Sequence, residues 1–173
     1  MPTVQQTSYF NIEGTISTSF NTAIAAFSLP SWLPTRPTVI LDWAEIAASL
    51  PSFGVTHIPV SLTQSFQGMN VGGGKRGMPS LDIFEVSCFV SRSNNANWLA
   101  QLRTMKDWVV TWAGDTKQLV IKDYAANQSS PSDTEYLINF MDIAPLASQP
   151  DNANPGVERQ RILLDYRHVH RVA

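Results

Sequence analysis

The sequence has few charged residues for its length. Asp, Glu, Lys and Arg make up 15% of its 173 residues, whereas soluble globular chains carry about 25%. Apolar residues make up 43%, close to the usual share of about 45–50%, so the chain can bury one sizeable core and is not disordered throughout. So little surface charge is typical of a subunit whose surface is partly covered by other subunits.

Other shortages exclude further classes of protein. A single cysteine, Cys88, allows neither an internal disulfide framework nor a cysteine-based zinc cluster. The net charge is −2, whereas a dedicated nucleic-acid-binding protein carries an excess of positive charge. No apolar run reaches the length of about 18 residues that a membrane span needs. The first residues show neither the basic nor the apolar region of a signal peptide. We therefore expect no membrane association and no need for an oxidising compartment.

The charge that is present is unevenly spread. Residues 1–91 hold eight charged residues, and residues 92–173 hold the other 18. Burying an unpaired ion is costly, so a surface that other subunits cover carries little charge. We therefore expect the first half to form most of the subunit contacts and the second half to be more exposed.

The beginning of the chain predicts an arm, a helix and a strand. The apolar residues among residues 1–14 do not recur with a clear period, so we expect an N-terminal arm ahead of a single domain over residues 15–173. Apolar residues recur at spacings of three and four through Ser17–Leu29, which predicts a helix that Pro30 ends. The β-branched run Pro37–Trp43 predicts a short strand.

A long antiparallel hairpin follows. Val55–Phe66 and Leu81–Ser91 both alternate with a period of two, which predicts two strands. Their connection, Gln67–Ser80, is rich in glycine and far longer than the usual two to five residues. On the second strand, one face is predicted to carry Phe84, Val86, Cys88 and Val90.

The clearest helix is predicted over Asn95–Ala113. Ser93 or Asn94 is positioned to cap its start, and Gly114 stands where a left-handed residue often follows a helix. Its apolar stripe, which is wide enough to cover one face of the hairpin, consists of Trp98, Leu102, Met105, Val109 and Trp112.

Three more strands are predicted over Gln118–Tyr124, Tyr136–Ile143 and Arg159–Val172. Turn-rich loops, Ala125–Thr134 and Pro145–Gly156, separate them. The order of elements predicts an α+β fold, in which helices pack on one face of a mostly antiparallel twisted sheet and the long hairpin and loops project.

The segment GGGKRG invites comparison with a phosphate-binding loop. Such a loop needs Gly five residues before the glycine that precedes its Lys, and it opens a helix. Here Met69 stands at the position of the first glycine, Arg76 replaces the Ser or Thr, and a predicted strand follows. We therefore interpret Gly72–Gly77 as a hairpin tip, either mobile or ordered against another subunit, and expect no cofactor site.

No other group of residues forms a convincing catalytic or metal site. His168 and His170 share a strand face and form a His-x-His pair, but no third ligand is apparent. Cys88 lies among apolar residues, which predicts an inert buried thiol. The tryptophans of the long helix favour core packing over base stacking. The arginines of Arg159–Arg171 favour a solvated sheet face or a contact with acidic loops of another subunit.

Five segments follow the first helix in a set order: LPSFGVTHIPVSLTQSFQGM, SLDIFEVSCFVSR, NANWLAQLRTMKDWVV, QLVIKDY and RQRILLDYRHVH. The last ends in Asp-Tyr-x-His-x-His, within an alternating, aromatic strand. In element order and hydrophobic pattern, Thr22–Val172 resembles the tail terminator family of long, non-contractile-tailed bacteriophages. These proteins are also described as tail completion or minor tail protein U-like proteins.

The resemblance implies a structural virion protein without enzymatic activity. Such proteins form a ring, typically of six copies, on the last ring of the tail-tube protein. The ring ends tube growth and offers the surface that docks the neck, or head-completion, protein of the DNA-filled head. DNA passes through the lumen without specific binding. The chain is then made in the cytoplasm of a bacterial host and lies at the head–tail junction of the virion.

Two groups of residues are expected to contact the axial neighbours, while the bodies of the subunits pack laterally. The hairpin tip supplies Met69, Asn70, Val71, Lys75 and Arg76, with the two cations facing acidic groups of a partner. The last loop supplies Asp151, Asn152, Asn154, Glu158 and Arg159. The alternative is another head–tail connector or tail-tube component. A small hydrolase or nucleotide-binding enzyme is the alternative of a different class.

Overall fold

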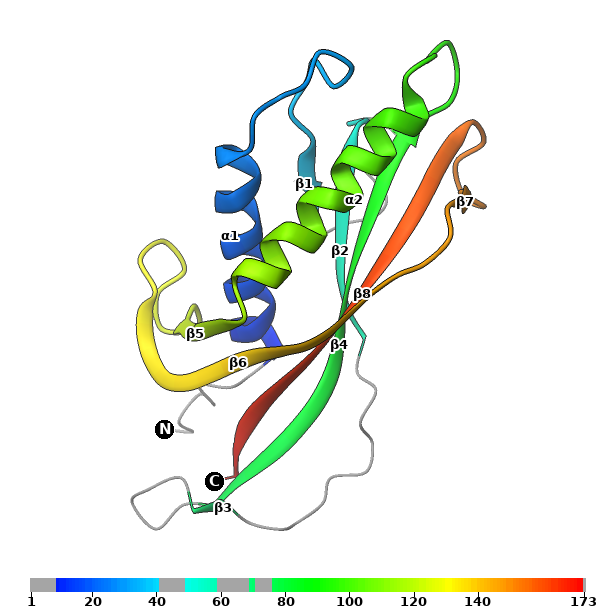
Figure 1. The fold of residues 1–173 in the computed structure, drawn as a ribbon. Coiled ribbons are helices and arrows are strands. Elements are labelled where there is room, and N and C mark those ends of the chain that lie inside the picture. Colours follow the sequence, from blue (N-terminus) through cyan, green and yellow to red (C-terminus); the bar gives the residue numbers. More distant parts are fainter. Residues whose placement is uncertain (1–8, 41–48, 59–68, 71–75, 173) are drawn as a thin grey trace.

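The protein has the predicted α+β fold. The computed structural model describes residues 9–40, 49–58, 69–70 and 76–172, and within these ranges a pair of helices packs against a mostly antiparallel, strongly curled sheet (Figure 1). Its strand order is β1-β2-β4-β8-β6-β5, with β3 on β4 and β7 on β8. The elements are α1 (Tyr9–Ala26), β1 (Thr38–Ile40), β2 (Ser52–Ile58), β3 (Met69–Asn70), β4 (Arg76–Ser91), α2 (Trp98–Asp115), β5 (Gln118–Asp123), β6 (Ser132–Pro145), β7 (Gln149–Pro150) and β8 (Val157–Val172).

The hydrophobic core lies between the two helices and one face of the sheet. The predicted alternation is confirmed, because the core face carries fully buried side chains from both central strands. They are Phe84, Val86, Cys88 and Val90 of β4 and Ile162, Leu164 and Tyr166 of β8. The ring of Phe20 on α1 joins the layers, since its centroid lies 5.0 Å from that of Phe53 on β2 and 4.9 Å from that of Trp112 on α2.

The predicted stripe of α2 faces this core. Leu102, Met105, Val109 and Trp112 are buried, and Trp98 packs at the edge of the core. Trp108 is also buried, and its ring stacks on that of Phe27, just after α1, at 5.3 Å. The expectation that the tryptophans of this helix pack in the core is therefore confirmed.

The predicted hairpin is confirmed, with a longer second strand. β2 and β4 pair antiparallel, but β4 begins at Arg76 instead of Leu81. The end of the predicted loop Gln67–Ser80 is therefore strand, because β8 pairs with β4 along its whole length and holds even its glycine and proline extended. Residues 59–68 and 71–75 of the predicted strand and loop lie outside the described ranges.

The predicted N-terminal arm needs correction. α1 begins at Tyr9, eight residues before the predicted start at Ser17. Residues 9–14, assigned to the arm, are therefore helical, and residues 1–8 lie outside the described ranges of the chain. At its other end the helix stops at Ala26, before the predicted Leu29.

Contacts with the strand β5 and the turn after it explain the longer helix. Asn11 and Ile12 are fully buried. The side-chain oxygen of Asn11 accepts the backbone N–H groups of Tyr124, at 2.9 Å, and Ala125, at 3.2 Å. At Gly14 the helix has no side chain, and the ring of Tyr124 packs there. These partners lie about a hundred residues away, so local periodicity did not reveal the first turns.

The start of α2 also differs from the prediction. α2 spans Trp98–Asp115 instead of Asn95–Ala113. Neither Ser93 nor Asn94 caps it, because the cap position falls on Asn97, which makes no capping hydrogen bond with its side chain. Asn94 instead adopts a left-handed conformation, with φ of 51°, in the turn before the helix.

Local hydrogen bonds, which the spacing of apolar residues does not reveal, set both ends of this helix. The side chain of Asn95 donates to the carbonyl of Ser91 at 2.8 Å and thereby holds the turn that precedes α2. At the other end, the N–H of Thr116 still donates to the carbonyl of Trp112 at 2.9 Å. Gly114 therefore lies within the helix, and the prediction of a left-handed residue there is wrong.

The three predicted C-terminal strands are confirmed as β5, β6 and β8. Both loops are shorter than predicted, because the last residues of Ala125–Thr134 belong to β6, and Pro145–Gly156 contains β7. The predicted strand Pro37–Trp43 contains β1, and its residues after Ile40 are not described. None of the helices in the described ranges is long and apolar enough to cross a membrane.

The two helical glycines provide a matched test of this packing. In the variant Gly14→Ala the new Cβ would lie 2.8 Å from Cδ2 of Tyr124, whose hydroxyl donates to Thr18 at 2.7 Å. We expect a loss of about 1–3 kcal/mol in the free energy of unfolding. A Cβ at Gly114 meets nothing within 4 Å, so Gly114→Ala should gain about 0.5–1 kcal/mol. Urea unfolding measures both, and a gain for Gly14→Ala contradicts the packing.

Candidate contact surfaces along β4 and β8

The paired strands β4 and β8 form the longest feature of the molecule. Each has 16 residues, and the pairing runs without interruption from Arg76–Val172 to Ser91–Val157. A strand of this length spans about 50 Å, whereas the 18 residues of each helix span about 27 Å. The helices therefore cover only a portion of the pair. In Figure 1 the end with Arg76 and Val172 extends beyond both helices.

The predicted tip residues gather at this projecting end. Met69 and Asn70 form β3, which pairs with Gly77 and Arg76 at the start of β4. The backbone thus brings three of the five predicted tip residues together. Val71 and Lys75 lie outside the described residues, as do the side chains of the other three.

The loop residues divide into two groups at the opposite end of β8. Asp151, Asn152 and Asn154 form the turn between β7 and β8, where Asn152 is exposed. The amide of Asn154 donates to the carboxylate of Asp151 at 2.7 Å. The N–H of Asp151 donates to the carbonyl of Val157 at 2.9 Å. The turn is therefore ordered by its own hydrogen bonds and lies at the surface, where a neighbour can reach it.

Glu158 and Arg159 belong to β8 and face partners within the chain. Glu158 is 4% exposed, and its carboxylate lies 3.3 Å from the guanidinium of Arg92. The guanidinium of Arg92 also lies 5.0 Å from the ring centre of Trp98. The guanidinium of Arg159 lies 2.7 Å from the carboxylate of Glu85. The two residues predicted at the end of the contact loop are thus already used in internal ion pairs, which the sequence patterns did not indicate.

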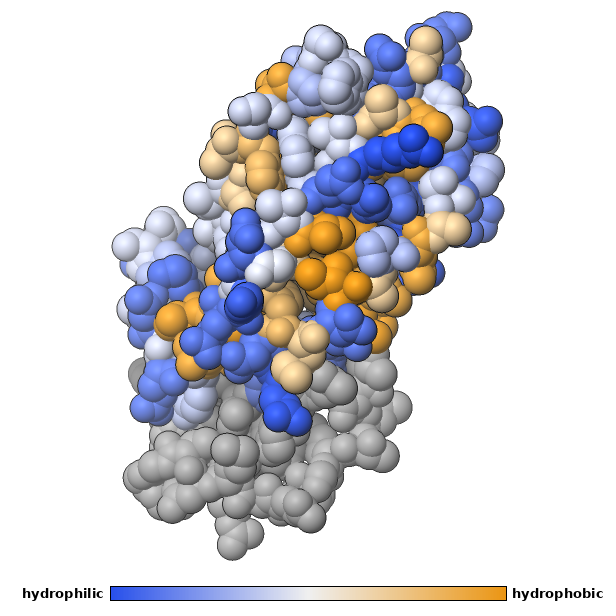
Figure 2. All heavy atoms as spheres, in the orientation of Figure 1, coloured by the Kyte–Doolittle hydropathy of each residue, from blue (hydrophilic) through white to orange (hydrophobic). Residues whose placement is uncertain are grey.

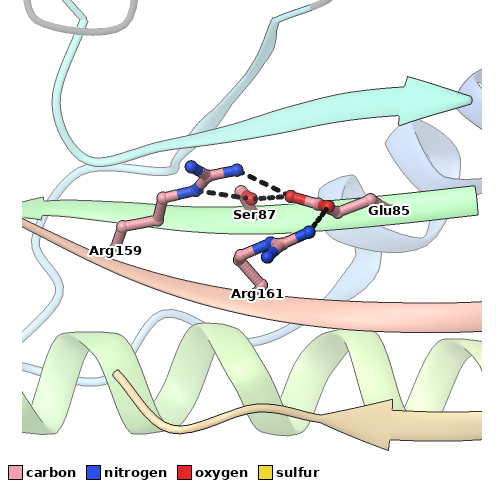
Figure 3. Close-up of polar contacts among 4 residues, drawn as sticks. All are labelled: Glu85, Ser87, Arg159 and Arg161. Carbon is pink, nitrogen blue, oxygen red and sulfur yellow. Dashed lines mark hydrogen bonds and ion pairs between the residues drawn. The ribbon is translucent and has the colours of Figure 1, made fainter. Parts of the chain in front are cut away.

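The most densely bonded polar group lies on the sheet face opposite the helices. It comprises Glu85 and Ser87 of β4 and Arg159 and Arg161 of β8 (Figure 3). The carboxylate of Glu85 accepts hydrogen bonds from Arg159 at 2.7 Å, Arg161 at 2.6 Å and Ser87 at 2.8 Å. Arg159 also donates to the hydroxyl of Ser87 at 3.1 Å. Both carboxylate oxygens are therefore used, and the carboxylate is nearly closed to solvent.

Two opposing effects set the charge of Glu85. Its side chain is 3% exposed, and burial on its own raises the pKa of a carboxyl group. The hydrogen bonds from Arg161 and Ser87, the charge of Arg161 and the hydrogen bond from Arg159 outweigh burial and lower the pKa below its ordinary value. Glu85 is therefore an anion that fixes two guanidinium groups on the sheet surface.

Sequence reasoning missed Glu85 and Arg161. Spacings of two residues do place Glu85 with Ser87, and Arg159 with Arg161, on one face of each strand. Which acid meets which arginine depends on the register, in which Ser87 lies opposite Arg161 and Phe89 opposite Arg159. The register is a long-range property, so the expectation of a solvated or subunit-facing arginine stripe missed the internal partner.

The other candidate groups are buried. The thiol of Cys88 is fully buried, which confirms the predicted burial, and burial raises its pKa, as expected for an unreactive thiol. The Nδ1 atom of His168 lies 3.8 Å from the carboxylate of Asp82, and both side chains are buried. Within the described ranges, no three His, Cys, Asp or Glu residues lie close enough to hold a metal ion. The side chain of His170 is not described.

No family model matches the sequence, and no curated protein matches it. The features that bear on function are the two ends of the β4–β8 pair and the ion cluster of Glu85, Ser87, Arg159 and Arg161 between them.

Replacing Glu85 tests the cluster. Glu85→Gln leaves two partly exposed guanidinium groups without their anion, so we expect the free energy of unfolding to fall by about 1–3 kcal/mol near neutral pH. Because the pKa of Glu85 is lowered in the fold, its contribution is present above the ordinary value of 4.5 and is lost as the pH falls through the folded pKa. The difference between wild type and variant should therefore narrow in acid.

Urea unfolding over a pH series measures this difference. The exposed Glu135 on β6 supplies the control, since Glu135→Gln should change stability by less than about 0.5 kcal/mol. A wild-type and Glu85→Gln difference that stays constant from neutral to acid pH would falsify the assigned role of the carboxylate.

Proposed function

We propose that the protein is a structural subunit of a bacteriophage tail. Copies assemble into a ring, of six subunits in the family that the sequence resembles, on the end of the tail tube. The ring ends growth of the tube and provides the surface to which the neck of the head binds. DNA then passes through the lumen, and the protein stays in the virion at the head–tail junction.

The observation that carries the proposal is the position of the two predicted contact groups. The tip with Met69, Asn70 and Arg76 and the turn with Asp151 and Asn154 lie at opposite ends of one pair of strands, about 50 Å apart. A subunit between a tube and a neck needs contacts at two opposite ends. A rigid antiparallel pair joins these two ends without a flexible linker.

The distribution of charge also supports the proposal. Residues 1–91 contain eight charged residues, and the side chains of four of them are described: Glu13, Arg36, Asp82 and Glu85. All four are partly or fully buried. The described surface of the first half thus presents no fully exposed charged side chain. Other subunits could cover such a surface without burying unpaired charges.

A phosphate-binding loop finds no support from the start of β4. The segment Gly72–Gly77 leads into this strand at Arg76, whereas a phosphate-binding loop leads into a helix whose N-terminal amides face the phosphate. A tail-tube subunit is the competing structural role. It differs by polymerising without limit, whereas a terminator forms one closed ring.

Electron microscopy of the purified protein, together with light scattering, separates these roles. Closed single rings of one uniform size support the proposal, and filaments or stacked rings contradict it in favour of a tube subunit. If the protein is monomeric, it is mixed with tail tubes purified from the parent phage. Density at one end of the tubes then supports the proposal, and bare tube ends contradict it.

Reversal of the tip charges tests the axial contact. Lys75→Glu with Arg76→Glu places two anions where acidic groups of a partner are expected, and like charges across an interface cost several kcal/mol. We expect joining of tails to heads to fall by about tenfold or more, with unchanged circular dichroism. The control, Arg103→Glu with Lys117→Glu, makes the same change of net charge at two exposed positions of α2 and its C-terminal loop. Equal joining by both variants would contradict a role of the tip.

A further inference from the structure

One segment of β6 forms a free edge of the sheet. The strand changes partner along its length, since residues 132–139 pair with β5 and residues 139–145 pair with β8. The side of residues 140–145 that faces away from β8 therefore pairs with no strand in the described ranges. A free edge of this kind is a template for strand addition by another molecule.

The surroundings of this edge are partly apolar. A groove of about 280 Å³ lies between the end of α2 and β6, and its lining includes the apolar side chains of Ala113, Phe140, Met141 and Ile143 and the charged residues Lys117 and Asp142. Met141 is 58% exposed. Figure 2 shows hydrophobic residues gathered on this face between α2 and β6. Apolar surface beside a free edge would strengthen pairing with an incoming strand.

The hydrogen-bond pattern identifies which groups point outward. The N–H of Leu146 donates to the carbonyl of Arg161 on β8 at 2.8 Å. Along an antiparallel ladder, alternate residues bond to the same neighbour. The backbone groups of Ala144 and Asp142 therefore face β8, and those at positions 143 and 145 face away from the sheet.

Neither Ile143 nor Pro145 has a backbone N–H free to donate to an incoming strand. The N–H of Ile143 donates to the side chain of Asp142 at 2.8 Å, and Pro145 has no N–H to offer. Just before them, the N–H of Phe140 donates to the carbonyl of Lys117 at 3.0 Å. The ladder is also irregular between Phe140 and Asp142, and such a bulge bends an edge out of register.

At the neighbouring strand β5, α1 occupies backbone donors in a similar way. The N–H of Lys122 donates to the hydroxyl of Thr15 at 2.9 Å, and the N–H of Tyr124, just after β5, donates to the side chain of Asn11 at 2.9 Å. At this end of the sheet, side chains of the same molecule thus occupy an N–H group on each of two strands and one in the turn after β5.

We propose that Asp142 and Pro145 block this edge against strand addition by a second copy of the chain. Copies then associate only through other surfaces, and the sheet does not extend from β6 of one molecule to β6 of the next. The block is independent of the proposed function, because it applies whether the working assembly is a ring, a tube or a monomer.

Unblocking the edge tests the proposal on the full chain. Asp142→Ala frees the N–H of Ile143, and Pro145→Thr restores the missing donor. We expect the double variant to keep its circular dichroism spectrum. Its mass by light scattering should rise with concentration to about twice the wild-type value or more, since two exposed edges can then pair. The control Asp107→Ala with Pro34→Thr makes the same changes at exposed positions elsewhere and should match the wild type.

A third variant separates the hydrogen bond from the charge. Asp142→Asn keeps an oxygen that can accept the N–H of Ile143, so it should behave as the wild type, whereas Asp142→Ala alone should already associate. Asp142→Ala alters only an exposed side chain, so this single variant provides the test if the double variant does not fold. The proposal is overturned if the unblocked variants keep the wild-type mass at every concentration, or if Asp142→Asn associates as strongly as Asp142→Ala.

Discussion

The pairing of β4 with β8 is the constraint on which the rest of the structure depends. Sixteen continuous residue pairs fix which side chains of each strand reach the core and which reach the opposite face. Because side chains alternate along a strand, a shift of β4 by one residue against β8 would move Phe84 out of the core and Glu85 into it. The same pairing determines how far the two ends of the molecule lie apart.

The two faces of the β4–β8 pair contribute to the fold in different ways. The face toward the helices carries the fully buried apolar side chains of the core, and these supply most of the favourable free energy of burial. On the other face, the carboxylate of Glu85 forms ion pairs with two arginines of β8. The ring of Phe89 packs beside them, with its centre 5.6 Å from the guanidinium of Arg159. A paired ion cluster adds little net stability compared with apolar packing, but it disfavours other registers, since a misaligned Glu85 would lose both partners.

Side chains of α1 and β6 occupy outward-facing N–H groups at one end of the sheet. Asn11 and Thr15 accept the outward N–H groups of β5 and the turn after it, and Asp142 accepts that of Ile143. These contacts explain why the first turns of α1 are polar without being an arm. Under the proposed block, they also leave fewer free backbone donors for a further strand at this end of the sheet.

The sequence alone determined the class of the fold, the order of its elements and the core faces of β4, β8 and α2, because apolar residues repeat with the period of the element that buries them. Only the tertiary structure decided the helix ends, the length of β4 and the partners of Glu85 and Asn11. The start of α1, the length of β4 and the partners of Glu85 and Asn11 depend on contacts between residues far apart in the chain, such as Asn11 with Tyr124 or Glu85 with Arg161. The ends of α2 depend instead on hydrogen bonds between residues four apart. Local periodicity carries no information on register or on long-range hydrogen bonds, so these features appear only when the strands and helices are assembled.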